Sequence, residues 1–437
     1  MRDLAIVLIV CGSLPFILVR PWIGVLVWAW LGYMNPHRLA WGFAYNFPFA
    51  EIVALVTMCG ILFSREKKRL PWSFTLFLWL ALIAWMNVTT VFALDPVSAD
   101  VEWDRTMKIQ LISLVTLLLM HGRDRINWLV IVIALSLGFF GVKGGIFTIL
   151  TGGGERVYGP PGSFIEDNNA LGLALVMTLP LMWYVQLRVP KPIYRWAILG
   201  AIGLTAFAIL STQSRGAFLA IVAMSAFLWV KSPKKFWTGL LIVITLPLLF
   251  AFMPSSWHER MGTIEDYQED GSALGRINAW WFAYNLAKDH PFVGGGFDTF
   301  NEELFQRYAP DPDNFHDAHS IYFEMLGEHG FVGLFLFLAL AAAVFASAQR
   351  VIRRARAGPE LAWARDLAGM VQTSLIGYAV GGAFLGLAYF DLYYHLVAIV
   401  LLLRSHVDDV LAATAQLEAP VRPLHAGSVV APMPPRQ

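Results

Sequence analysis

Charged residues are scarce in this sequence, and their scarcity excludes a soluble protein. Asp, Glu, Lys and Arg make up 14% of the 437 residues, against roughly 25% in an ordinary globular domain. Apolar residues make up 57%, and the mean hydropathy is +0.58. Such a chain lacks the polar side chains to cover a soluble fold. We therefore expect an all-α polytopic membrane protein.

Other absences narrow the chemistry. The two cysteines, Cys11 and Cys59, lie in apolar stretches and form neither a disulfide framework nor a zinc spacing. We find no P-loop, no Rossmann glycine fingerprint and no zincin motif. The net charge of +1 does not favour a nucleic-acid partner. We expect no metal, no cofactor and no bound nucleic acid.

Apolar windows of about 20 residues, long enough to cross a bilayer, recur along almost the whole chain. Residues 4–34 are compatible with two interpretations, because Pro15, Arg20 and Pro21 could kink one long span or turn between two short ones. Counted as one crossing from a cytoplasmic N-terminus, they bring the total to about twelve. The other spans are expected at 46–63, 71–94, 107–121, 128–150, 170–187, 196–212, 217–230, 236–253, 324–347, 367–390 and 393–403.

Basic residues collect in alternate loops, as the positive-inside rule requires of cytoplasmic loops. The same phase places the longest connection, residues 254–323, on the periplasmic side. No inverted duplication of the kind seen in transporters is visible. The five basic loops contain Arg65, Lys67, Lys68, Arg69; Arg123, Arg125; Arg188, Lys191, Arg195; Lys231, Lys234, Lys235; and Arg350, Arg353, Arg354, Arg356, Arg365.

The chain therefore divides into four parts. Residues 1–253 are N-terminal transmembrane helices, 254–323 a periplasmic loop, 324–404 C-terminal transmembrane helices, and 405–437 a tail expected to be cytoplasmic and disordered. The loop is acidic: residues 254–319 contain twelve Asp and Glu against four Lys and Arg. Short helices are expected at 278–288 and 299–308, on either side of a glycine-rich breaker. A loop of this length with its own helices is usually functional.

Three side chains near the periplasmic face are the main candidates for chemistry. Arg215 lies between two apolar spans with almost no room for a loop, so it is either a functional cation or an arginine that snorkels to the interface. Arg276 opens an expected helix and either grips phosphate oxygens or pairs with a nearby acid. His319 precedes the next span and is either a general base or a hydrogen-bonding interface residue.

Weaker candidates lie on the same face. Arg156 and Asn169 belong to a loop rich in glycine and proline, and Lys143 is expected to be buried about two turns below it. Arg105 and Lys108 open another span. Residues 311–317, with His316, form either a divalent-metal site or, as we favour, a solvated acidic loop.

These cations together predict a polyanionic headgroup on a ligand whose body lies in the bilayer. A polyprenyl diphosphate fits, because the tail needs the membrane and the diphosphate needs Arg and Lys. Diphosphate is a good leaving group, so an enzyme using it needs chiefly to stabilise developing charge and to orient an acceptor.

Taken in order, the motifs resemble the O-antigen ligase and polymerase superfamily of bacterial envelope enzymes. Residues 20–38 are similar to a branch described as O-glycosylation ligases associated with exosortase systems. The superfamily resemblance covers 155–333. It rests on Arg156, Gly159 and Asn169; Ser214, Arg215 and Gly216; Gly275, Arg276, Trp280, Pro291, Gly294 and Gly296; and His319, Glu328, Gly330 and Gly333.

The resemblance implies a metal-independent, inverting glycosyltransferase of the GT-C type in the bacterial inner membrane. It would move a glycan from undecaprenyl diphosphate to a sugar hydroxyl of lipid A-core on the periplasmic face, and we expect it to act as a monomer. Carried over to this sequence, Arg215 and Arg276 would bind the diphosphate and His319 would activate the acceptor. An O-antigen polymerase or a protein O-glycosylation ligase with the same donor, and less readily an anion transporter, remain alternatives.

Overall fold

The computed structural model describes residues 1–255, 257–258 and 271–418. These residues form helices and contain no β-strand, which confirms the expected all-α architecture. The α-helices are α1 (Arg2–Val19), α2 (Trp22–Met34), α3 (Phe49–Phe63), α4 (Phe74–Val91), α5 (Pro96–Leu119), α6 (Arg123–Leu150), α7 (Asn168–Arg188), α8 (Pro192–Ser211), α9 (Arg215–Lys231), α10 (Lys235–Phe252), α12 (Gly271–Asp289), α13 (Glu302–Tyr308), α14 (Ile321–Arg354), α15 (Ala362–Gly381) and α16 (Asp391–Glu418). Four 3₁₀ helices connect them: η1 (Pro36–Leu39), η2 (Phe43–Tyr45), η3 (Pro359–Leu361) and η4 (Gly382–Phe384).

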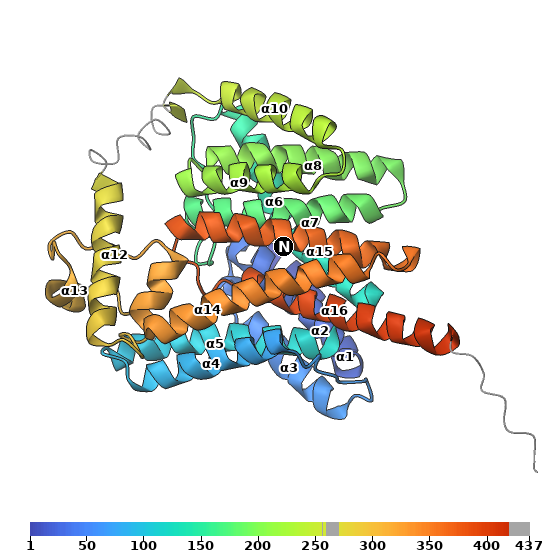
Figure 1. The fold of residues 1–437 in the computed structure, drawn as a ribbon, viewed down its shortest axis with the longest axis horizontal. Coiled ribbons are helices and arrows are strands. Elements are labelled where there is room, and N and C mark those ends of the chain that lie inside the picture. The colour runs from blue at the N-terminus through green and yellow to red at the C-terminus, as the bar shows by residue number, and fades with distance from the viewer. Residues whose placement is uncertain (256, 259–270, 419–437) are drawn as a thin grey trace, which may run out of the picture.

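Most of the long helices run along the long axis of the molecule, and α12 crosses them at one end beside α13 (Figure 1). We call this end the α13 end; α7, α9, α14 and α16 begin there. The five basic loops lie at the opposite end, which we call the basic end. There Arg69 pairs with Asp409 at 2.8 Å and Arg125 with Glu66 at 2.9 Å. The five loops that the sequence predicts to lie on one side of the membrane therefore do lie at one end of the bundle.

Eight helices of the described residues are long and apolar enough to cross a membrane, and α2 and α3 are shorter apolar helices. The chain is accordingly a multi-pass membrane protein. The total of about twelve crossings stays a prediction.

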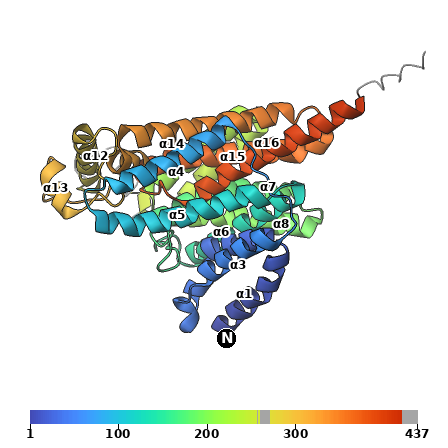
Figure 2. The same cartoon turned by 90° about the horizontal axis from the view of Figure 1, so that it is seen from below.

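Residues 2–34 form two helices with a turn at Arg20 and Pro21, so the structure has the second of the two interpretations, and Figure 2 shows α1 at the edge of the bundle. The start of α1 lies beside the chain that follows α2, because Arg2 donates to the carbonyl oxygen of Leu39 at 3.0 Å. Asp3 also accepts a hydrogen bond from the backbone N–H of Ala44. Pro21 stands at the start of α2, and proline lacks the N–H that would continue a helix. The two helices therefore form a hairpin.

Helix α7 is the centre of the bundle, with 89% of its apolar window buried. It packs against α6, α8, α9 and α15, and Ser374 of α15 donates to its Met177 carbonyl at 2.7 Å. Helices α6 and α8 approach closely because Gly141 and Gly145 of α6 leave room for residues of α8, as small residues commonly do between membrane helices.

The C-terminal tail begins later than expected. Helix α16 continues to Glu418, so residues 405–418 are helical, and 419–437 lie outside the described residues. Val407 is buried, and Asp408 pairs with Arg354 of α14. These contacts to a neighbouring helix extend α16 beyond its apolar part.

The long connection contains both helices that were expected in it, α12 and α13. Helix α12 begins by Gly271, earlier than expected, so Arg276 lies in its second turn instead of opening it. The two helices share a small core of their own, in which the rings of Phe282 and Phe305 stack 4.5 Å apart. This core gives the segment a fixed shape beside the ends of the membrane helices.

Candidate functional site

Three helices begin side by side at the α13 end and position the candidate residues. Helix α7 is capped by Asp167, whose carboxylate accepts from the backbone N–H of Asn169 at 2.8 Å. Helix α9 is capped by Ser214, which accepts from Ala217 at 3.2 Å. Arg215 is thus the first residue of α9, at a helix end whose dipole favours bound anions.

Two hydrogen bonds hold the Arg156 loop and α7 against the turn before Arg215. Arg156 donates through Nε to Oε1 of Gln213 at 3.0 Å, and Asn168 donates to the carbonyl of Thr212 at 2.6 Å. Gln213 has a φ of 54°, a left-handed conformation that is uncommon outside glycine. Arg156 and the start of α9 with Arg215 are therefore brought into one corner.

Helix η4 separates Arg215 from the start of α14. A Cβ at Gly216 would lie 3.1 Å from Cβ of Phe384, and one at Gly382 would lie 2.6 Å from the side chain of Ile321. Because Ile321 follows His319 by two residues, Arg215 and His319 lie on opposite sides of η4. Glycine at these positions lets the three backbones approach.

Helix α12 fixes the segment that carries His319. Trp280 donates through Nε1 to the carbonyl of Ala318 at 2.8 Å, and its ring stacks on Phe323 with centroids 4.9 Å apart. His319 itself has a φ of 41°. A strained backbone of this kind costs about 1–3 kcal/mol and is typical of functional sites.

Arg276 and His316 belong to the same corner. The His316 ring lies directly over Gly275, where a Cβ would come within 2.6 Å of ring atoms. Asn278 donates to the carbonyls of Asp311 and Asn314, at 2.7 and 3.0 Å. The role of Gly275 is therefore to let the 311–317 segment pack on α12. The family resemblance assigned no place to His316, and the structure puts it against Gly275.

Burial, more than the surrounding charges, lowers the pKa of His319. Burial lowers the pKa of its imidazole, and the positive charge of Arg276 lowers it further, while Asp317 and Asp167 act in the opposite direction. The net pKa shift is downward. These electrostatic contacts place Arg276, Asp167 and His319 together, although they come from α12, the start of α7 and the start of α14.

Glu328 lies in the interior, where it joins a hydrogen-bond network. Its carboxylate accepts from the backbone N–H of Asp298 at 3.0 Å and from the hydroxyl of Tyr389. Tyr389 also contacts Nε2 of His329 at 2.7 Å, and Nδ1 of His329 lies 2.7 Å from the Thr89 hydroxyl. Glu328 therefore holds the framework of the site.

The glycine motif serves the same framework. Gly294, Gly296 and Gly330 all have positive φ, between 65° and 87°, and Gly330 forms a kink in α14. Backbone hydrogen bonds tie the 291–296 segment to that kink, including Gly295 N–H to the Gly327 carbonyl at 2.8 Å. These glycines let a loop pair with an interrupted helix.

Of the three weaker candidates, Arg105 contacts the loop that precedes α7, while Lys143 and Lys108 lie elsewhere. Lys143 is exposed on α6, which corrects the expectation that it is buried, because the glycine face of α6 is the one that packs. Lys108 is exposed and pairs with Asp104 at 2.7 Å and Glu51 at 3.4 Å. Arg105 is exposed, and its guanidinium lies 3.4 Å from the centroid of the Phe164 ring.

The acidic 311–317 segment shows no metal geometry. Within the described residues no three His, Cys, Asp or Glu side chains come together as possible metal ligands. The backbone of Asp311 is instead engaged on both sides by Asn278, since its N–H donates to Asn278 Oδ1 at 3.0 Å. The segment is a structural turn that carries His316 and leads to His319.

Sequence reasoning missed Gln213, Asn278 and Tyr389. Gln213 precedes the motif at residues 214–216. It could have been proposed as the hydrogen-bond partner of Arg156. Asn278 and Tyr389 act through contacts with residues 33 and 61 positions away, which no local pattern signals.

Comparison with known protein families gives two matches. Residues 200–338 match the family model described as O-antigen ligase. This part of the chain is therefore similar to the O-antigen ligase family. The match contains Arg215, Arg276 and His319, so all three candidate residues lie within the matched segment. Residues 1–189 match a family of unknown function, and no curated protein matches the chain. The similarity of residues 20–38 to the exosortase-associated branch stays a prediction.

Proposed function

We propose that this protein is an O-antigen ligase that transfers a glycan from undecaprenyl diphosphate to a sugar hydroxyl of lipid A-core. One observation carries the proposal: Arg215, Arg276 and His319, distant in the sequence, lie around the starts of α7, α9 and α14 at one end of the bundle. Arg276 acts on the half-buried imidazole of His319, and Arg215 lies across η4 from it; two permanent cations and a histidine of lowered pKa suit a diphosphate donor and a hydroxyl acceptor.

Each residue then has a role in one displacement. His319 accepts the proton of the acceptor hydroxyl, an effect typically worth roughly 10²–10⁴-fold. The acceptor oxygen forms its bond to the anomeric carbon from the face opposite the diphosphate, so the configuration inverts. The bond from that carbon to the phosphate oxygen breaks, and its electron pair leaves with undecaprenyl diphosphate. Arg215, Arg276 and Arg156 stabilise the leaving charge, and no metal is needed.

The distribution of charge supports a periplasmic site in the inner membrane. Basic loops collect at the opposite end of the molecule, which the positive-inside rule assigns to the cytoplasm. The glycan donor and the lipid A-core acceptor would both reach the α13 end through the outer leaflet.

Complementation of a Gram-negative strain that lacks its own ligase but makes lipid-linked O-antigen tests the proposal. A lipopolysaccharide ladder that appears with the wild-type chain and disappears with Arg215→Ala is the expected result. If material instead lengthens only in a polymerase-deficient strain, or appears on a protein acceptor, the ligase assignment is wrong and the related activity replaces it. Saturable anion flux in liposomes without glycan transfer would contradict the enzyme assignment altogether.

A further inference from the structure

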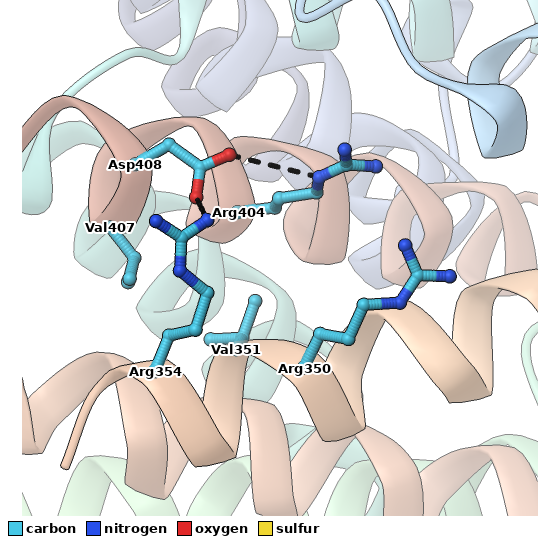
Figure 3. A pocket seen from close by; sticks show the side chains of 6 residues that line it. All are labelled: Arg350, Val351, Arg354, Arg404, Val407 and Asp408. Carbon is cyan, nitrogen blue, oxygen red and sulfur yellow. Dashed lines mark hydrogen bonds and ion pairs between the residues drawn. The ribbon is translucent and has the colours of Figure 1, made fainter.

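A second cluster of arginines lies at the basic end, far from the candidate active site. Arg350 and Arg354 of α14 and Arg404 of α16 line an open cavity of about 70 Å³ between the two helices, together with Val351 and Val407. Figure 3 shows the three guanidinium groups facing the space between the helices. Pockets that enclose a whole ligand have volumes of about 300–1,000 Å³, so this cavity suits a single anionic group such as a phosphate and is too small for a glycan.

The cavity has more positive charge than its own residues neutralise. Asp408 is the one acid that lines it, and it pairs with Arg354 and, at 3.8 Å, with Arg404. Arg350 makes no ion pair or hydrogen bond within the described part of the chain. The positive-inside rule accounts for arginines at this end of the molecule. It does not account for the convergence of three arginines from two helices on one cavity.

The position of the cavity favours a lipid over a free ion. One turn before Arg350, Ser347 hydrogen-bonds Thr75 at the start of α4, at 2.9 Å. The same stretch of chain exposes Trp72 and Phe74, at 73% and 68%. Exposed aromatic residues at a helix start are typical of the membrane interface. The arginines therefore lie at headgroup depth.

We propose that the cavity between α14 and α16 binds the phosphate of an anionic phospholipid of the cytoplasmic leaflet. Guanidinium groups bind phosphate oxygens through paired N–H donors, and basic pockets between membrane helices on this side are suited to acidic headgroups. Arg350 and Arg404 would supply the main contacts, and Asp408 would hold Arg354 in place. This site is independent of the proposed transfer reaction.

Lipid binding to the purified full-length protein tests the proposal. The protein in detergent is titrated with phosphatidylglycerol and, separately, with phosphatidylcholine, and bound lipid is counted by native mass spectrometry. We expect phosphatidylglycerol to bind at least about tenfold more tightly. Each of Arg350→Gln and Arg404→Gln should weaken its binding about fivefold, since a basic residue near the membrane surface contributes about that factor. Arg353→Gln, on the same helix but outside the cavity, should leave it unchanged.

Three results would overturn the proposal. Equal binding of the two lipids would remove the preference for an acidic headgroup. An equal loss in Arg353→Gln would indicate diffuse surface charge instead of a site. Displacement of the lipid by the same concentration of inorganic phosphate would make it a free-ion site. If Arg350→Gln does not fold, Arg350→Lys replaces it in the same titration. This variant keeps the positive charge but loses the paired N–H donors, so its affinity for phosphatidylglycerol should fall by less.

Discussion

The two ends of the helix bundle use arginine in different ways. At the basic end, arginines stand beside carboxylates from other helices, as in Arg69 with Asp409 and Arg188 with Asp366. At the α13 end, Arg215 follows Gln213, whose backbone is left-handed, and Arg276 acts on His319, whose backbone is also left-handed. Arginine therefore stabilises the fold through ion pairs at one end, and at the other it lies among helix starts where we propose that it binds a diphosphate.

The largest expected effect separates these two uses of arginine. Arg215→Ala and Arg276→Ala should each reduce glycan transfer about 100-fold or more, because each removes a positive charge from the leaving diphosphate. Arg365→Ala at the basic end, which removes an exposed pair with Asp366, should leave transfer unchanged. The measurement is the rate of transfer from lipid-linked glycan in proteoliposomes, with thermal unfolding as a control for folding. Equal losses in all three variants would contradict the distinction.

A second prediction concerns the framework under the site. Gly330→Ala should lower the free energy of unfolding by about 1–3 kcal/mol, because the kink in α14 holds Gly330 at a φ of 66° with the Phe292 carbonyl against it. Gly369→Ala in α15, where a Cβ would meet nothing within 4 Å, should leave stability unchanged or slightly raise it. Unfolding in mixed micelles of increasing denaturing detergent measures both. Equal stability of the two variants would show that the kink is not required.

A smaller effect tests the electrostatics around His319. Its pKa lies below the usual value because of burial and Arg276. His319 should therefore stay neutral at pH values below the ordinary histidine pKa, and the rate of transfer should fall only at more acidic pH. Asp317 raises this pKa. Asp317→Asn should therefore lower it further and move the acidic limb of the transfer rate to lower pH by a fraction of a unit. An acidic limb that stays fixed, or that moves to higher pH, would show that it does not report His319.

Some features of the site follow from local sequence and some do not. Arg215 could be identified because an arginine between two apolar spans is rare and costly in a membrane. The glycines at 294, 296 and 330 were recognised as a motif, but their purpose was not, because it depends on backbone pairing between the 291–296 segment and α14. Lys143 was placed wrongly, since hydropathy does not tell which face of α6 packs against α8.

The sequence by itself determined the class of fold, the alternation of loops between the two sides and the similarity to the O-antigen ligase family, because hydropathy, charge placement and motif order are local or periodic properties of the chain. The tertiary structure decided that residues 2–34 form a helical hairpin, that α16 extends to Glu418 and that Arg276 acts on His319. These outcomes depend on contacts between helices remote in sequence: the hydrogen bond from Arg2 to Leu39, the pairing of Asp408 with Arg354, and the packing of η4 between α9 and α14. Packing of this kind depends on the shape and charge of two surfaces together, so neither segment alone specifies it.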